Sequence, residues 1–215
     1  MNKEKKIENK YKVIGMICVG IALSVAATTA YFTDSDSLTN TFTTGGVTSE
    51  LTETQYNAQD PAERDNIGPG KTMIKDPVVT NKDSLDMYTF LKVSVPVKEV
   101  KTYDPVSKKV LEAQVMPLFT WETDSQWTLI KTEKLADTWD YYYAFGTAQQ
   151  MTAIKPNQST TSLFKHNQIT FINVIEGQGL ENTRQDVIVT DYSGQTTDLG
   201  TNVPKDILEI YMNHR

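Results

Sequence analysis

The chain has 215 residues, with 21 Lys and Arg against 27 Asp and Glu, and a formal net charge of −6 at pH 7. Such an acidic chain has no electrostatic attraction for nucleic acid or for an anionic membrane, so we expect neither as a partner of the folded protein. The single cysteine, Cys18, excludes an intramolecular disulfide and a thiolate metal site.

The first thirty residues are organised like a secretory signal peptide. Residues 1–12, MNKEKKIENKYK, carry five Lys and two Glu, and residues 13–30, VIGMICVGIALSVAATTA, carry no charge. Thr28 and Ala30 supply the small side chains that a signal peptidase requires, so we expect cleavage between Ala30 and Tyr31. The alternative is a retained anchor helix, because eighteen apolar residues reach the lower limit for spanning a bilayer.

Cleavage changes the composition of the remaining chain. Removing five of the 21 basic and two of the 27 acidic residues leaves 16 and 25, a formal charge of −9, and no cysteine. We expect such a chain to be secreted and to contact the membrane only before cleavage. We also expect it to stay soluble until a specific surface binds a partner. We divide the full sequence into three parts: residues 1–30 (signal peptide), 31–46 (N-terminal segment) and 47–215 (one folded domain).

Period-two alternation recurs along residues 47–215, and long helical periodicity does not. Residues 47–55 and 71–81 predict strands, separated by a loop rich in Pro, Asp, Asn and Gly over 57–70. Residues 87–100, MYTFLKVSVPVKEV, alternate most regularly. One face carries Met87, Thr89, Leu91, Val93, Val95 and Val97, and the other carries Tyr88, Phe90, Lys92 and Ser94. Pro96 lacks a backbone donor, so this strand should end, bulge or lie at an edge there.

Shorter strands are predicted further along the chain, at residues 118–123, 127–132, 139–146, 162–165, 169–175 and 184–192. Short helices are predicted at 108–116 and at 204–212, where Pro204 occupies the first turn. About nine short strands without a regular βαβ alternation favour an all-β, mainly antiparallel fold, a jelly-roll-like β-sandwich with one or two short helices.

Catalytic motifs are missing from this sequence. His166 and His214 are nearly fifty residues apart and form no HExxH pattern, and there is no GxSxG elbow or phosphate-binding glycine loop. Acidic pairs such as Asp34 with Asp36, or Asp137 with Asp140, could bind calcium or act as acid and base, but a chain this acidic carries many solvated carboxylates. We therefore predict no catalytic residue, no metal ligand and no cofactor.

The aromatic run in residues 138–145, TWDYYYAF, allows two interpretations. Trp139, Tyr141, Tyr143 and Phe145 share one face of the strand, and Asp140, Tyr142 and Ala144 share the other. Exposed rings could stack on sugars or anchor a protein partner. Rings on the inner face of a sandwich instead form core, which we favour for this row and for Trp121 and Trp127.

Several stretches together resemble the TasA and camelysin family of exported bacterial proteins. They are AYFTDSDSLTNTFTTGGVTSELTE (residues 30–53), GPGKTMIKDPVVTNKDSLDMYTFLKVSVPV (68–97), LFTWETDSQWTLI (118–130), YYYAFG (141–146), SLFKHNQITF (162–171) and DVIVTDY (186–192). The junction of signal and strand and the segment KDPVVTN are the most specific of them. The resemblance implies release by a dedicated signal peptidase of the SipW type and a role as subunit of biofilm-matrix or surface fibres.

The resemblance further implies a jelly roll that polymerises by donor-strand complementation, in which the N-terminal segment of one subunit fills a groove in the next. The strand would be Leu38, Thr39, Asn40, Thr41, Phe42 and Thr43, and Gly45 and Gly46 would form a flexible joint. Leu38, Asn40 and Phe42 share one face, so Leu38 and Phe42 in pockets would set the register. The alternative is that residues 37–44 are the first strand of their own subunit.

The expected partner is therefore the chain itself, in a head-to-tail homopolymer, with an accessory matrix subunit left open. Lys–Asn cross-links within the subunit are also left open. Some camelysin-type members are described as metalloproteases of the cell envelope, and His166 would be among the ligands of such an enzyme. A third hypothesis is a sugar- or protein-binding module that uses Trp139, Tyr141 and Tyr143. The C-terminal EIYMNHR carries no sorting motif, so sortase anchoring is not expected.

Overall fold

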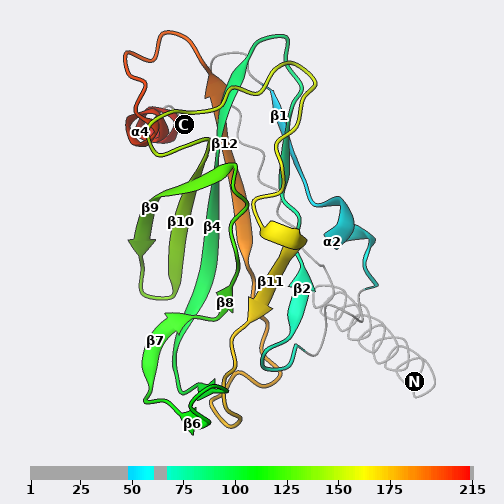
Figure 1. Cartoon of the computed structure of the whole chain (residues 1–215), viewed down its shortest axis with the longest axis vertical. Coiled ribbons are helices and arrows are strands. Elements are labelled where there is room, and N and C mark those ends of the chain that lie inside the picture. The colour runs from blue at the N-terminus through cyan, green and yellow to red at the C-terminus, as the bar shows by residue number, and fades with distance from the viewer. Residues whose placement is uncertain (1–47, 61–66, 214–215) are drawn as a thin grey trace, which may run out of the picture. The chain divides into compact units, whose positions relative to one another are not determined.

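The computed structural model describes residues 48–60 and 67–213, all of which belong to one compact unit, Leu38–Arg215. The fold is an all-β sandwich in which every strand pair is antiparallel, as the alternation predicted (Figure 1). The larger sheet has the order β12 (Ile188–Gln195), β4 (Met87–Val100), β10 (Thr138–Phe145), β9 (Trp127–Lys134), and β7 (Gln114–Pro117) pairs with the end of β4.

The second layer consists of two small sheets. One pairs β1 (Ser49–Thr52) with β3 (Val78–Asn81), and the other has the order β2 (Thr72–Ile74), β11 (Gln168–Phe171), β8 (Phe119–Thr120). On the side of β3 away from β1, the Asn157 and Thr160 N–H groups donate to β3 carbonyl oxygens at 2.9 Å. The main core lies between the two layers and contains Leu91, Val93 and Val95 of β4, Tyr143 and Phe145 of β10, Leu51 of β1, Val79 of β3 and Phe171 of β11.

Strand β4 confirms the predicted division of faces. Leu91, Val93 and Val95 point into the main core, whereas Phe90 lies on the outer face of the sheet. The strand does not end at Pro96. It changes partner there, because Pro96 is the last residue opposite β10 and Val97 is the first opposite β7. The Pro96 carbonyl accepts from the Leu118 N–H at 2.9 Å and the Val97 N–H donates to the Asp137 carbonyl at 3.0 Å, so the backbone stays hydrogen-bonded on both sides of the missing donor.

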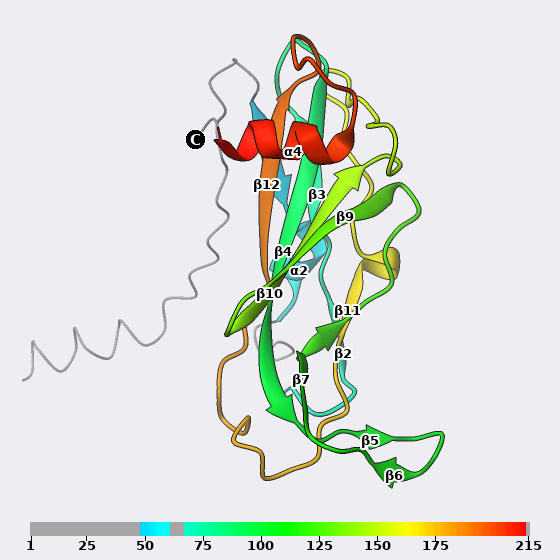
Figure 2. The same ribbon diagram turned by 90° about the vertical axis from the view of Figure 1, so that its left-hand side faces the viewer.

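Helix α4 (Pro204–Asn213) covers the outer face of the larger sheet, as Figure 2 shows. Pro204 occupies the first turn, and the buried Ile207, Leu208 and Tyr211 form the apolar stripe of the helix. The stripe packs on Phe90, Tyr142, Ala144, Met151 and Tyr192 in a second, smaller core. The predicted helix at 204–212 is thus confirmed. Among the described residues, no helix is both long enough and apolar enough to cross a membrane.

The predicted helix at 108–116 is wrong. This segment forms β6 (Lys109–Val110), which pairs with β5 (Tyr103–Asp104), and then β7. Lys108 adopts a left-handed φ of 56°, which a helix cannot accommodate, and the Asp104 carboxylate accepts N–H bonds from Val106 and Ser107 in the turn. Local turn chemistry therefore overrides the weak helical pattern of Val110, Leu111 and Val115.

Other predicted strands are shorter than expected. Residues 71–81 divide into β2 and β3 because Pro77 restricts the backbone between them. After β1, residues 54–58 form the short helix α2 (Thr54–Ala58), where the sequence predicted a strand to residue 55. Residues 162–165 contribute only the isolated bridge between Thr123 and Phe164 and lead into a 3₁₀ turn, Lys165–Asn167.

Candidate functional site

The residues assigned to export and assembly lie outside the described part of the chain. They are Ala30, Tyr31, Leu38, Thr39, Asn40, Thr41, Phe42, Thr43, Gly45 and Gly46. Their roles, and the division at residues 30 and 46, stay predictions. The structure describes the chain from residue 48, and β1 begins at Ser49.

Strands β1 and β12 meet at one side of the sandwich. Each is the outermost strand of its own sheet within the described residues. They belong to different layers and are joined across the core by a hydrogen bond from Ser49 Oγ to Asp191 Oδ2, 2.6 Å long. This side of the sandwich is the part of the described fold nearest in sequence to the predicted assembly strand, so we treat it as the candidate site.

Asp191 is completely buried, at 0% exposure, and three hydroxyl groups surround its carboxylate. Besides Ser49, Thr89 Oγ1 donates to Asp191 Oδ1 at 2.6 Å and Ser193 Oγ donates to the same oxygen at 2.7 Å. The three donors come from β1, β4 and β12, so the carboxylate links three strands in two layers by hydrogen bonds. We call Ser49, Thr89, Asp191 and Ser193 the Asp191 cluster.

The pKa of Asp191 is shifted by two opposing effects. Burial raises the pKa, because the charged form loses its hydration, and the three hydroxyl donors lower it by stabilising the carboxylate. Burial is the larger effect, so the pKa lies above the ordinary value of an aspartate. The folded state therefore binds a proton more tightly than the unfolded chain does, and its stability falls as the pH rises through the raised pKa.

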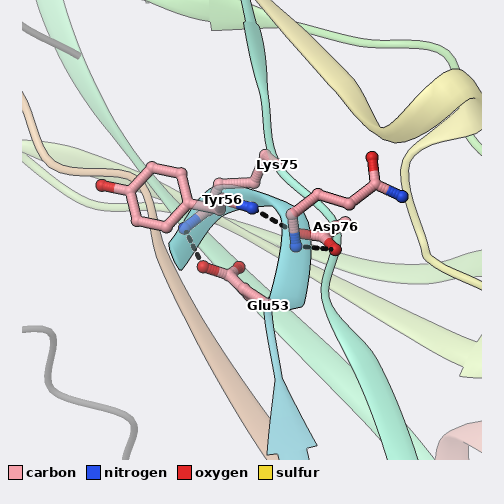
Figure 3. A network of polar contacts seen from close by, with 5 residues as sticks. Glu53, Tyr56, Lys75 and Asp76 are labelled. Carbon is pink, nitrogen blue, oxygen red and sulfur yellow. Dashed lines mark hydrogen bonds and ion pairs between the residues drawn. The ribbon is translucent and has the colours of Figure 1, made fainter. Parts of the chain in front are cut away.

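The other end of β1 is fixed by a second buried polar network (Figure 3). Lys75 Nζ lies 2.9 Å from Glu53 Oε2, and the two side chains are 11% and 9% exposed. The same ammonium lies 4.9 Å from the centre of the Tyr56 ring. The Asp76 carboxylate accepts from the N–H groups of Gln55 and Tyr56 at 2.7 and 3.0 Å, and so satisfies the first turn of α2.

This network explains the segment KDPVVTN in physical terms. Lys75 and Asp76 hold the chain just after β1, and Val79 lies opposite Leu51 of β1 in the core. Asn81, also completely buried, donates to the carbonyls of Leu85 and Ile154 at 2.7 and 2.8 Å and so shapes the turn between β3 and β4. The segment therefore positions β1 and the turn that follows β3.

Sequence reasoning missed both polar groups. Asp191 sits at an inward position of the alternation Val187, Val189, Asp191, Ser193, where an apolar residue is expected. A carboxylate at such a position is the signal that would have revealed a buried polar cluster.

His166, the residue named for a metal site, lies in the exposed 3₁₀ turn with a left-handed φ of 60°. Its neighbour Lys165 donates to Glu122 Oε2 at 2.6 Å, and the pKa of Glu122 is lowered chiefly by Lys165 and further by the charge of His166. Within the described ranges, no three His, Cys, Asp or Glu side chains gather closely enough to hold a metal ion. The donor set present there does not fit a zinc site. His214 lies outside these ranges.

The other acidic and aromatic candidates also have structural positions. Asp137 is exposed, whereas Asp140 is buried and lies 3.4 Å from Lys92 Nζ, so these two carboxylates do not form a pair. Asp34 and Asp36 lie outside the described residues. Tyr143 and Phe145 belong to the main core and Tyr141 packs against it, which confirms the core interpretation for three of the four rings.

Trp139 differs from the other rings of this row. It is half-buried, and the Lys134 ammonium lies 3.9 Å from the centre of its indole ring. Trp121 and Trp127 pack as predicted, with indole N–H groups that donate to Tyr143 Oη at 3.2 Å and to the Thr161 carbonyl at 3.1 Å. The described rings therefore do not form an exposed platform for a sugar.

The protein is thus an antiparallel β-sandwich in which buried polar side chains connect strands by hydrogen bonds and an ion pair. Residues 10–142, more than half of the chain, match the model of a protein family described as camelysin metallo-endopeptidase. The chain therefore belongs to the camelysin family, as the sequence resemblance predicted. A search of curated proteins and a search of solved structures gave no match.

Proposed function

We propose that the chain is an exported structural subunit of extracellular matrix or cell-surface fibres, and that it polymerises by donating its N-terminal strand to the neighbouring subunit. The observation that carries this proposal is the position of β1 and β12 at one side of the sandwich. An added strand placed at this side extends either sheet by main-chain pairing, while its inward side chains cover the edge of the core between the layers.

The direction of the chain favours exchange between subunits. The Lys82 N–H donates to the Thr48 carbonyl at 2.9 Å, so the described chain enters β1 beside the turn between β3 and β4. In a head-to-tail filament, a segment that continues outward from this end enters the next subunit running in the direction of β4. It is then antiparallel to β12, because β12 is antiparallel to β4. The same segment folded back into its own subunit runs parallel to β12.

The predicted strand has suitable side chains for this role. Leu38 and Phe42 supply apolar surface on one face, and Gly45 and Gly46 allow the chain to leave its own sandwich at any angle. Release by a signal peptidase of the SipW type at Tyr31 then creates the assembling end. The fibre is a homopolymer in this proposal, and an accessory subunit is not required by it.

The test uses the secreted protein that begins at Tyr31. The double variant Leu38→Asp/Phe42→Asp should lose filaments in electron micrographs, while the melting temperature of the unassembled chain stays the same. The matched control is Thr39→Asp/Thr41→Asp, which places the same charges on the other face of the strand. If the first variant instead lowers the melting temperature of the monomer, residues 37–44 belong to their own sandwich and the donor-strand mechanism is rejected.

The family description favours a second candidate, a metallo-endopeptidase. In the part of the chain that the structure describes, the donor set does not fit a zinc ion, and we derive no catalytic step. Metal analysis and a casein-cleavage assay of the same secreted protein separate the two candidates. If the protein binds stoichiometric zinc and cleaves casein in a reaction that a chelator abolishes, it is a peptidase. A purely structural role is then no longer preferred.

A further inference from the structure

The β5–β6 hairpin projects from one end of the sandwich, beyond the last residues of β4 (Figure 2). It exposes an unusual amount of apolar side chain for so short a segment. Val106 at the tip is 90% exposed, and the other large exposed side chains of the hairpin and of β7 are Tyr103, Val110, Leu111 and Val115. Exposed apolar residues gathered in this way indicate a contact surface.

An open groove lies beside the hairpin. Its volume is about 370 Å³, and its lining includes Tyr103 and Leu111 from the hairpin, Met116 from β7, and Phe171 and Ile172 at the end of β11. Tyr103 and Leu111 are both exposed and part of the groove lining, so we treat the groove and the tip of the hairpin beside it together and call them the hairpin surface. Its largely apolar lining suits the side chain of another polypeptide.

The opposite end of the sandwich carries a complementary feature. Leu85, in the turn between β3 and β4, is 55% exposed. Strand β4, with 14 residues, separates this turn from the hairpin, which corresponds to about 43 Å at the rise of an extended strand. The described chain begins beside the same turn, because the Lys82 N–H donates to the Thr48 carbonyl.

The charges at the two ends are also complementary. Lys108 and Lys109 are exposed at the turn of the hairpin, next to Val106. Asp83 and Asp86 flank Leu85 at the other end, and hydrogen bonds from Ser84 hold the pKa of Asp83 below its usual range. Lys82, the basic residue of this turn, is paired with Glu50 at 2.9 Å. At the hairpin turn the two lysines outnumber the one carboxylate, Asp104, whereas Asp83 and Asp86 give the other turn a net negative charge, so the two ends carry opposite net charges.

We infer that the hairpin surface of one subunit receives the Leu85 turn of the next copy of this chain along the filament. This inference rests on the proposed function, because a strand donated from the turn end of one subunit brings that end against the hairpin end of its acceptor. Leu85 enters the apolar groove beside Val106 and Leu111, and Asp86 faces Lys108 and Lys109. The contact adds a second attachment to the donated strand and fixes the angle between subunits.

Residues 31–215 contain no cysteine, so disulfide trapping in the protein that begins at Tyr31 tests this contact directly. The double variant L85C/V106C should give a ladder of covalent oligomers when filaments of the secreted protein are oxidised. The two positions are too far apart within one subunit to bond, since a disulfide needs Cα atoms within about 7 Å. The matched control is L85C/L135C, because Leu135 is equally exposed but lies in the turn between β9 and β10.

A second pair of variants tests the energetics of the contact. Val106→Asp should raise the protein concentration needed for assembly about tenfold or more, as loss of a central interface residue does. It should not change the melting temperature of the monomer, because the Val106 side chain is in solvent there. Lys109→Glu should weaken assembly, and the added exchange Asp86→Lys should restore it.

The outcomes separate this inference from the proposed function. If filaments form and depend on Leu38 and Phe42, but V106D assembles normally and L85C/V106C gives no ladder, the inference is overturned and the donor strand remains. If no filaments form at all, both fail. If V106D instead abolishes binding of the unassembled protein to vesicles of anionic phospholipid and the ladder is absent, the hairpin is a lipid contact and the inference is wrong.

Discussion

Replacing Ser49 by Ala tests whether the Asp191 cluster holds β1 against the larger sheet. The substitution removes one of three hydroxyl donors from a completely buried carboxylate and changes almost no volume. A hydrogen bond to a charged group contributes roughly 1.5 to 3 kcal/mol to the free energy of unfolding. Since the carboxylate is not exposed to water, solvent cannot replace the lost donor. We therefore expect the free energy of unfolding to fall by the full contribution of this hydrogen bond.

The loss should depend on pH. Where Asp191 is ionised, Ser49→Ala should cost about 1.5 to 3 kcal/mol, which corresponds to a fall of about 3 to 12 °C in melting temperature for a domain of this size. Where Asp191 is protonated, the same hydrogen bond is one between neutral groups and is worth roughly 0.5 to 1.5 kcal/mol. The two regimes meet at the raised pKa of Asp191.

Urea unfolding of the chain that begins at Tyr31, followed at several pH values, measures this difference. The control is Ser159→Ala, because Ser159 forms an exposed hydroxyl pair with Thr80 at 2.8 Å and bonds no carboxylate. We expect less than about 0.5 kcal/mol for the control at every pH. If Ser49→Ala matches the control throughout the pH range, the cluster does not tie β1 to β12 and our account of this side of the sandwich fails.

Three further predictions concern the same domain. Asp191→Asn should weaken the dependence of the unfolding free energy on pH. Relative to the variant, the wild type should lose unfolding free energy as the pH rises above the ordinary carboxyl range. If urea titrations give both proteins the same slope of unfolding free energy against pH, the raised pKa of Asp191 is contradicted. Lys75→Met should cost about 3 to 5 kcal/mol by leaving a buried carboxylate without its ammonium, whereas Lys82→Met, which breaks an exposed pair, should cost less than about 1 kcal/mol in the same denaturation assay. Gly194→Ala should cost about 1 to 3 kcal/mol, because the new Cβ would lie 2.5 Å from the Tyr211 ring under α4, and calorimetry should show no comparable loss for Gly68→Ala, where the space is open.

The sequence predicted best where one strong pattern dominates. The alternation in residues 87–100 placed Leu91 and Val93 on one face and Phe90 on the other, and the structure keeps this division because burial on a face of a strand allows a single register. The apolar stripe after Pro204 likewise predicted α4. The prediction of a helix at 108–116 was wrong because the helical pattern of this segment is weak. The turn at Asp104 and Lys108 decides the conformation instead, and hydrophobic periodicity does not detect such a turn.

The polar contacts across the core could not be predicted from the sequence for a different reason. Ser49 and Asp191 are 142 residues apart, and no local rule places them within hydrogen-bonding distance. Lys75 and Glu53 likewise meet only because β1 and β3 pair in a particular register. Such contacts follow from the fold as a whole, although an aspartate at an inward strand position indicates that one exists.

The anchoring of β1 at both ends determines how the subunit responds to mechanical load. A pull on residue 48 along the strand acts parallel to β1, whose hydrogen bonds to β3 run across the direction of force. The ladder bonds are therefore loaded in shear and must break together, rather than opening one after another as in an unzipped hairpin. The Ser49–Asp191 bond and the Lys75–Glu53 pair share that load at either end, so tension applied through the N-terminal segment is spread over both layers of the sandwich.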